Sequence, residues 1–498
     1  MAHRLMAVLL VVACTSARER GGSAASSAPT SSSGGGHEDS VPAVDTGDSV
    51  ATYSPTSDTG GGDADGDGFV AVVDCDDADA SAFPGAHEVL WDAVDSNCDG
   101  VDGTAGAFAE GPEGGVMLGA MLVVADWDDD SLDEVAASAP SNVHVWEYSA
   151  INRGAVGLYQ SNLRRSGWIP GDESLHDFPL AMVHTRTAAG SRLVAASWES
   201  GSAVGRVYVL APSDESRAHG PVGSVAVESF TGAGGHVVAL GEVNGAVWAT
   251  THRWGGEPWT LSEVPVPFGQ GSADAAEVVA SGPGGFGRVV RHDADGVLIT
   301  GLDSAYWFQG FDGEFDAASA DSWLLGDGAL GAAADLLHDA DYGSLAVLGA
   351  PSDDSDFEDG GRVYVLDPRR EGLGSTAPVA VIHADGVGRH WGTSVATGDM
   401  NGDGHDDVLV GAPGGSVALG SAHLFLGPLR GDIQAWDAAW SFFGTQQGDQ
   451  TGQSVALGHF DNDGQADILV GRPGYDAPQR QDVGRIDRVL RSEMVWHP

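Results

Sequence analysis

A short segment near the start of the chain concentrates carboxylates at the spacing that hard cations require. It contains three alternating aspartates, a glycine and a further acid eleven residues after the first: Asp63, Asp65, Asp67, Gly68 and Asp74. These positions supply the oxygen ligands of a calcium loop, and the glycine permits its sharp turn. Carboxylates this close repel one another unless a divalent cation lies between them. The segment therefore predicts a Ca²⁺ site.

A second acidic segment and two cysteines accompany the first loop. The segment has the same alternation without an acid at the twelfth position, and we expect it to share ligands with the first loop: Asp95, Asn97, Asp99 and Asp102. Cys75 and Cys98 lie beside the two loops. In an exported chain such cysteines favour a disulfide. Metal ligation by the two thiols is the alternative.

The stretch around these loops resembles the MopE-type metal-binding motif of bacterial surface proteins. The shared features are Asp-Cys-Asp-Asp at 74–77, Pro-Gly-Ala-His-Glu at 84–88 and Asn-Cys-Asp-Gly at 97–100. The resemblance implies a calcium-stabilised, disulfide-closed module over 63–103. Ala93 stands where that motif usually has glycine.

Further acidic loops recur between residues 104 and 498, within a repeat that must position them. Gly392–Gly415 aligns with Gly452–Tyr475 at an offset of 60, which superposes Ser-Val-Ala, Asp-Gly and Leu-Val-Gly in both copies. Each copy has a short strand, an acidic loop, a Val/Leu/Ala strand that ends in Gly-Ala-Pro or a variant, and a Gly-initiated strand with an aromatic residue. Small residues before the proline suit a strand packed near a crowded central axis. This order of strands and loops is typical of β-propeller blades.

Seven apolar runs mark the copies: Val135–Pro140, Leu193–Ser197, Val237–Leu240, Val278–Ser281, Leu345–Pro351, Val408–Pro413 and Ile468–Pro473. The 395 residues from Thr104 to Pro498 then give about 56 residues per copy, enough for four strands and their connections. We expect an all-β, seven-bladed β-propeller. Six or eight blades are the alternatives, because the third and fourth copies are the weakest.

The segment from Gly398 to Pro413 resembles the FG-GAP repeat of integrin α-chain propellers, in which this acidic loop binds calcium. Carried over by position, the resemblance implies five ligands in the sixth copy: Asp399, Asn401, Asp403, the carbonyl of His405, and Asp407. The same positions of the last copy hold Asp461, Asp463 and Asp467, with His459 in place of the first acid. The first copy has Asp126, Asp128, Asp130 and Glu134, with Ser131 in place of the turn glycine.

Two other acidic turns are assigned no metal. In the fifth copy Leu337 and Leu345 replace the outer acids around Asp339 and Asp341, and the turn at 293–296 is an ordinary hairpin turn. For all of these loops, solvated Asp-Gly turns are the alternative to calcium sites. A calcium ion bound there is expected to act as a structural clip, because each loop lies between consecutive strands of one blade.

The first residues have the pattern of an export signal. Arg4 precedes a short apolar run, and Val11 to Cys14 resembles a bacterial lipobox. We expect a signal peptide over 1–13, a lipidated Cys14 and a Ser/Thr/Gly-rich tether over 14–62. The protein is then a lipoprotein of the outer membrane or cell surface, held by its lipid alone, with ordinary secretion as the alternative.

The charge of the chain restricts its partners. Against 72 Asp and Glu there are 23 basic residues, all arginine, so the 498-residue chain carries a net charge of −49. Such a field repels phosphates and excludes a nucleic-acid binder. It favours hard cations.

No enzyme constellation is present: we find no Gly-x-Ser-x-Gly elbow, zinc helix, phosphate loop or papain-like cysteine. We therefore expect a calcium-stabilised binding or adhesion-type protein that recognises protein or glycan partners. The alternatives are a glycan-degrading enzyme, with raised-pKa carboxylates in the propeller channel, and a structural envelope protein. Trp391, Trp436 and the group Trp248, Trp254 and Trp259 are candidates for a binding face, although core packing is the expected role of each.

Overall fold

The structure is a computed structural model that describes residues 108–494 apart from 113, 141–153, 172–174, 189, 200–204, 214–220, 227, 232–235, 253–258, 265–277, 311–314, 370–377, 415–417, 462 and 479. The predicted signal peptide, the lipidation site at Cys14, the tether and the 63–103 module with Cys75 and Cys98 lie outside these residues. Their assignments stay predictions. Among the described residues, no helix is long and apolar enough to cross a membrane.

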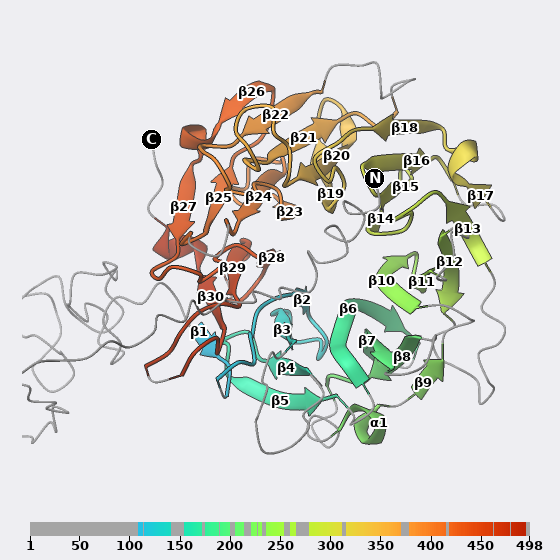
Figure 1. The fold of residues 1–498 in the computed structure, drawn as a ribbon, viewed down its shortest axis with the longest axis vertical. Helices are drawn as coiled ribbons and strands as arrows, with labels where there is room; N and C mark the ends of the chain where they lie inside the picture. Colours follow the sequence, from blue (N-terminus) through green and yellow to red (C-terminus); the bar gives the residue numbers. More distant parts are fainter. Residues whose placement is uncertain are drawn as a thin grey trace, which may run out of the picture. The chain divides into compact units, whose positions relative to one another are not determined.

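The described residues form seven sheets arranged as the blades of a propeller (Figure 1). Blade 1 consists of β2 (Leu122–Ala125), β3 (Glu134–Ala139), β4 (Ala155–Tyr159) and β5 (Arg165–Pro170). Blade 2 consists of β6 (Leu175–Thr187), β7 (Gly190–Glu199), β8 (Gly205–Leu210) and β9 (Glu228–Thr231), with α1 (Val222–Val225) before β9. Blade 3 consists of β10 (His236–Val243), β11 (Ala246–His252), β12 (Trp259–Val264) and β13 (Val278–Gly282).

The remaining blades follow the same order. Blade 4 consists of β14 (Val290–His292), β15 (Val297–Gly301), β16 (Ser304–Phe308) and β18 (Ser322–Leu325). Blade 5 consists of β19 (Ala333–Asp339), β20 (Gly343–Ala350), β21 (Arg362–Leu366) and β22 (Ala380–His383). Blade 6 consists of β23 (Ser394–Gly398), β24 (Asp407–Ala412), β25 (Ser421–Phe425) and β27 (Trp440–Phe443). Blade 7 consists of β28 (Ser454–Gly458), β29 (Asp467–Arg472), β30 (Arg485–Val489) and β1 (Phe108–Glu110), followed by η5 (Arg491–Glu493).

The ring closes on itself in two ways. The innermost strands contact one another in a complete circle: β2, β6, β10, β14, β19, β23, β28 and again β2. The outermost strand of blade 7 is β1, which pairs antiparallel with β30 although the two lie at opposite ends of the propeller sequence. Closure buries the apolar sheet faces that a linear stack of blades would leave exposed at its two ends, since residues of blades 7 and 1 form one apolar cluster. The seven-bladed, all-β prediction is confirmed.

The seven apolar runs were assigned correctly in five blades, where they form or extend the second strand. The assignment of the third and fourth runs is wrong: Val237–Leu240 lies in β10 and Val278–Ser281 in β13, and both strands belong to blade 3. The second strand of blade 4 is β15, whose five residues are all buried. A buried strand in any position of a blade gives the same short apolar run, so the run alone does not identify its place.

Two connections add a parallel fifth strand to the preceding blade. β17 (Phe315–Asp316) pairs with β13 and is followed by η2 (Ala317–Ser319). β26 (Gly431–Gln434) pairs with β22 and is followed by η4 (Ala435–Asp437). Blades 4 and 6 thereby bind to the outer edges of blades 3 and 5. Apolar clusters fill the spaces between blades; Trp391, fully buried, packs between blades 5 and 6.

Five blades begin with the same backbone device, a buried residue followed by a glycine with φ between 81° and 90°. The pairs are Leu118-Gly119, Phe286-Gly287, Leu330-Gly331, Trp391-Gly392 and Thr451-Gly452. Each glycine N–H donates to the penultimate carbonyl of its blade's second strand, at 2.8–3.1 Å. In blade 6, a Cβ on Gly392 would lie 2.8 Å from the backbone of Arg362 and of Gly349 in blade 5. Gly349, one of the small residues before Pro351, lies against the same segment, because a Cβ on it would overlap the Gly392 carbonyl oxygen. The backbone of the neighbouring blade therefore limits the size of this residue.

Replacing Gly392 with alanine should destabilise the propeller by about 2–5 kcal/mol, because a left-handed backbone and a steric overlap act together. Gly431→Ala is the matched control, since Gly431 also has a positive φ, of 67°, but has no atom within 4 Å of its Cβ position. Thermal and urea unfolding of both variants measures the difference. Equal losses in the two variants would contradict the close packing of blades 5 and 6.

Candidate metal centres

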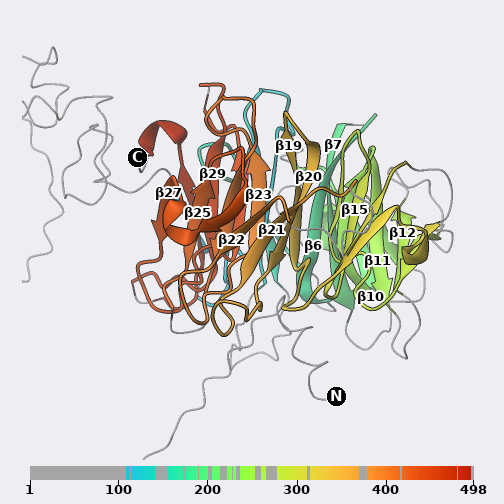
Figure 2. The same ribbon diagram turned by 90° about the horizontal axis from the view of Figure 1, so that it is seen from above.

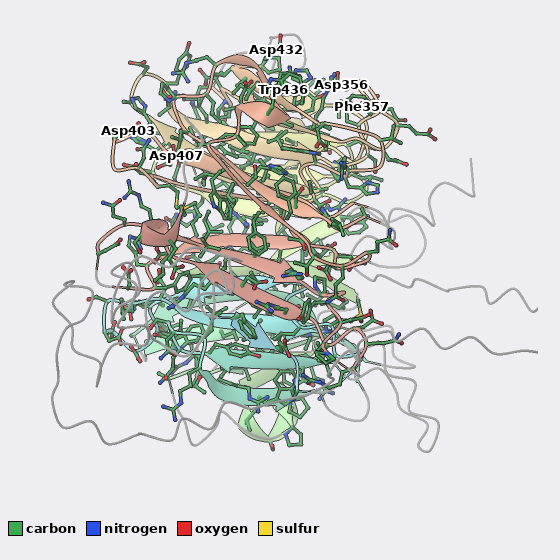
Figure 3. All side chains as sticks on the ribbon, turned by 90° about the vertical axis from the view of Figure 1, so that its left-hand side faces the viewer. Asp356, Phe357, Asp403, Asp407, Asp432 and Trp436 are labelled. Carbon is green, nitrogen blue, oxygen red and sulfur yellow. The ribbon has the colours of Figure 1, made fainter. Side chains whose placement is uncertain are left out.

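The three predicted acidic loops of the propeller lie side by side in the ring. Each joins the first strand to the second in blade 6, blade 7 or blade 1, which are consecutive. Because strands alternate in direction, all loops between first and second strands leave the same face of the ring. Figure 3 shows Asp403 and Asp407 on this face, on the side opposite to Asp356 and Phe357. We call it the acidic-loop face.

The blade 1 loop brings three carboxylates together. Oxygen atoms of Asp126, Asp128 and Asp130 all lie within 4.8 Å of one another, and among the described residues no other group of three acidic, histidine or cysteine side chains does so. Backbone N–H groups orient them: Asp126 accepts from Asp129 and Ser131 at 2.7 and 3.2 Å. Calcium binds oxygens at 2.3–2.6 Å, so two ligands of one ion lie at most about 5 Å apart. The three carboxylates fit a single divalent cation.

The same loop carries backbone strain at two positions. Asp129 and Ser131 have φ values of 68° and 78°, where the blade 6 loop has Gly402 and Gly404. A non-glycine residue in this region costs on the order of 1–3 kcal/mol. Arg186 from blade 2 pairs with Asp129 and donates to the Asp126 carbonyl at 2.8 Å. This arginine stabilises the turn without pairing with the three clustered carboxylates.

In the blade 6 loop the predicted ligands form a network of side chain to backbone bonds. Asp399 accepts from the N–H groups of Gly402 and Gly404 at 2.7 and 2.9 Å. Asn401 donates to Asp403 at 3.0 Å, and Asp403 accepts from the His405 N–H at 2.9 Å. Asp399 and Asp403 lie on a turn whose central residues, 402–404, are exposed, so the carboxylate oxygens of both remain open to a cation from solvent.

The blade 7 loop keeps part of this pattern. Asp461 accepts from the Asp463 N–H at 2.8 Å, and Asp463 accepts from the Gln465 N–H at 2.7 Å. His459 occupies the first position and lies 3.6 Å from Asp133 of blade 1. The loop lacks the first carboxylate of the blade 6 loop but has Asp461 where that loop has Asn401, so both loops offer three carboxylates.

The last acid of each loop lies inside the blade, beneath the exposed turn. Glu134, Asp407 and Asp467 are buried, and each accepts from the backbone N–H seven residues earlier at 2.9–3.0 Å. Burial is the largest cause that raises the pKa of Glu134 to about 7 and that of Asp407 to about 6, and the neighbouring aspartates add to it. Burial also raises the pKa of Asp467. A bound cation would favour the ionised form of all three.

Blade 5 has a guanidinium at its acidic turn. Arg430 pairs with the buried Asp339 at 2.9 Å and lies over the Tyr342 ring, 4.6 Å from its centroid. Burial alone would raise the pKa of Asp339, but the bonds from Arg430 and two N–H groups lower it below its ordinary value. No metal was assigned to this turn from the sequence, and Arg430 already supplies a positive charge to Asp339 there. Sequence reasoning missed Arg430, which lies 91 residues from Asp339.

The turn at 293–296 is a hairpin turn between β14 and β15, as predicted, closed by the Asp293 N–H on the Gly296 carbonyl at 3.1 Å.

Sequence reasoning also missed two pairs of hydrogen bonds that join neighbouring blades. Asp133 and the backbone of His459 exchange two hydrogen bonds of 2.7 Å, and Asp406 does the same with His338 at 2.6 and 3.1 Å. The sequence feature that could have predicted these bonds is the additional acid directly before the last acid of each loop, Asp133 before Glu134 and Asp406 before Asp407. The acidic loops thus join blade 7 to blade 1 and blade 5 to blade 6.

Comparison with known families locates the two motifs. The family "FG-GAP repeat" matches residues 391–425 and 451–487, within blades 6 and 7. The family described as "Putative metal-binding motif" matches residues 74–102. These matches confirm the presence of FG-GAP repeats and of the MopE-type motif, and they support divalent-cation binding.

Three integrin α chains illustrate the relatives that match. The chain is 39% identical over 84 residues to integrin alpha pat-2 of Caenorhabditis elegans, which covers 17% of this chain and 6% of that protein. It is 33% identical over 123 residues to integrin alpha-PS2 of Drosophila melanogaster, covering 24% and 8%. It is 36% identical over 106 residues to human integrin alpha-IIb, covering 20% and 10%. The chain therefore resembles only a small part of each of these relatives.

Glu134 should make the cation-free protein less stable as the pH rises. Its pKa is higher in the folded state than the 4.5 of the unfolded chain, so folding takes up a proton and stability falls between about pH 4.5 and 7. Glu134→Gln keeps the acceptor for the Trp127 N–H and removes the charge. In chelator, the free energy of unfolding of the variant relative to that of the wild type should increase by on the order of 2–3 kcal/mol from pH 5 to 8, as measured by urea unfolding. A difference that does not change with pH would contradict the burial of this carboxylate.

Proposed function

We propose that this protein is a calcium-stabilised binding or adhesion-type protein that recognises a protein or glycan partner through its propeller. The observation that carries the proposal is the FG-GAP match to blades 6 and 7 within a closed ring that leaves one face free of the acidic loops. The similarity to integrin α chains supports a binding role. We call the face opposite the acidic loops the free face.

The free face presents apolar side chains over blades 5 and 6. Phe357, Val387, Leu419 and Phe443 are 40%, 67%, 42% and 58% exposed, and they lie in or beside the loops that leave this face. Hydrogen bonds between neighbouring loops hold the surface: Gly388 donates to the Glu358 carbonyl at 2.8 Å, and Gly448 donates to the Ala418 carbonyl at 2.9 Å. Figure 2 shows the ring from the side, with loops at both ends of the strands. A pre-ordered apolar surface is suited to a partner, because little ordering entropy is lost on binding.

Calcium is the cation that the loops fit best. All their candidate ligands are carboxylate, amide or carbonyl oxygens, which hard cations prefer, and the chain has no lysine to neutralise them. Calcium bound there would neutralise the exposed carboxylates and the buried acid beneath them. At a Kd of about 0.1 mM, 1 mM calcium would add about 1.4 kcal/mol per site.

Millimolar calcium should raise the melting temperature by a few degrees relative to chelator. The double variant Asp128→Asn/Asp403→Asn should lose part of this rise, because each loop loses a charged ligand. Asp341→Asn is the matched control, since Asp341 occupies the Arg430-filled turn of blade 5 and should leave the calcium response unchanged. An unchanged melting temperature in wild-type protein would contradict calcium binding.

Attachment at a cell surface through lipidated Cys14 completes the proposal. It is supported by the apolar run and lipobox-like residues 11–14 and by the Ser/Thr/Gly-rich composition of 14–62.

The enzyme alternative has no observation in its favour. Among the described side chains, the carboxylates with raised pKa lie in or beside the first-to-second strand loops or on η5, and none lies on an innermost strand.

A screen of surface proteins and glycans against the full chain, with and without calcium, tests the binding role. We expect at least one partner, bound more weakly after Phe443→Ala and Val387→Ala, because these side chains are exposed on the free face. Trp323→Ala is the control, since Trp323 is 50% exposed within the outermost strand of blade 4, away from blades 5 and 6. Concentration-dependent self-assembly without any partner would instead support the structural envelope protein.

A further inference from the structure

The outer rim of blades 5 and 6 gathers exposed acids and aromatic rings. The connection between β20 and β21 exposes six consecutive residues, Asp354–Asp359, of which four are acidic and one is phenylalanine. Trp436 on η4 is 75% exposed, and the side chain of Asp432 on β26 is 80% exposed. Core packing is therefore the wrong assignment for Trp436, whereas it is correct for Trp391 and Trp248. We define the acidic–aromatic surface as Asp354, Phe357, Glu358, Asp359, Asp432 and Trp436.

A single imidazole joins the two segments of this surface. His383, at the end of β22, lies with Nδ1 2.6 Å from Asp356 and with Nε2 3.2 Å from Asp432. Asp356 belongs to the loop that carries Phe357, and Asp432 lies four residues before Trp436. The aromatic rings therefore flank one continuous surface, and Figure 3 shows Asp356, Phe357, Asp432 and Trp436 in the same upper part of the ring.

Local bonds hold the surface in place before any partner arrives. Arg362 donates to both oxygens of Asp356, at 2.6 and 2.8 Å. The Asp359 N–H donates to Asp354 at 2.7 Å, which closes the loop around Phe357. Beneath Trp436, β26 pairs with β22 over four residues, and Asp437 accepts from the Gln434 N–H at 2.8 Å. Rigid aromatic anchors lose little entropy on binding.

The carboxylates of the surface have few partners within the part of the chain that the structure describes. Arg362 is used by Asp356, and among the described residues no arginine forms an ion pair with Asp354, Glu358, Asp359 or Asp432. The net charge of −49 excludes an acidic partner on electrostatic grounds. An exposed tryptophan together with carboxylates that no described arginine pairs offers a cation both a ring face and an ion pair.

We propose that the acidic–aromatic surface docks a basic segment of a partner protein, with an arginine or lysine seated between Trp436 and Asp432. The inference rests on the proposed binding function and names the class of partner. Apolar side chains of the same segment would contact Phe357. Because several acids surround the site, association should be fast at low salt and should weaken as salt screens the charges.

The test uses a fluorescent peptide of alternating arginine and leucine, titrated with the full chain by anisotropy in low salt. We expect saturable binding that weakens at least tenfold in Trp436→Ala/Asp432→Asn. The matched control is Trp323→Ala/Glu263→Gln, because Trp323 is 50% exposed on β18 and Glu263 is exposed on β12, both away from this rim. The control should bind within about twofold of wild type. Circular dichroism melting of each variant verifies the fold.

Equal binding by the two double variants would overturn the inference, because general negative charge would then explain the affinity. So would a wild-type protein that ignores the peptide but binds a neutral oligosaccharide through Trp436. If the partner screen finds a ligand whose affinity Trp436→Ala/Asp432→Asn leaves unchanged, the binding function stands and this inference fails. If the chain binds neither the peptide nor any screened partner, both fail.

Discussion

The repulsion between carboxylates at the first-to-second strand loops is the constraint on which the rest of the structure depends. Folding brings Asp126, Asp128 and Asp130 within 4.8 Å of one another and buries Glu134 beneath them. Such a cluster needs a proton, an arginine or a metal ion. The ring uses an arginine in blade 5, where Arg430 meets Asp339. We propose that a bound cation takes this role in blades 6, 7 and 1, and these blades include the one at which β1 closes the circle.

This arrangement gives the two faces of the propeller different roles. The acidic-loop face contains the acidic loops and the hydrogen bonds that join blade 7 to blade 1 and blade 5 to blade 6. The free face and its rim carry the exposed apolar and aromatic side chains, among them Phe357 and Trp436. Under the proposed function, stability would be concentrated on one side and recognition on the other. Loops can change at the free face without disturbing the groups that hold the ring together.

The parts of the fold that sequence reasoning predicted are those with a local signature. Buried second strands read as continuous apolar runs, and the Gly-x-Val-Tyr-Val-Leu segments at β8 and β21 are third strands as their pattern indicates. The boundary between blades 3 and 4 was misplaced, because an apolar run does not reveal its position in a sheet. Phe286-Gly287, which matches the Trp391-Gly392 pattern, would have identified the start of blade 4. Contacts such as Arg430 with Asp339 depend on the parallel addition of β26, which no local pattern reveals.

The most direct test of the central claim is terbium luminescence sensitised by Trp127, which is buried within the blade 1 loop, whereas Met400 and Phe460 occupy its position in blades 6 and 7. Terbium replaces calcium in oxygen sites and emits when a nearby tryptophan is excited. We expect a terbium signal that calcium displaces and that falls in both Trp127→Phe and Asp128→Asn. A signal that both variants leave unchanged, or that calcium does not displace, would contradict it.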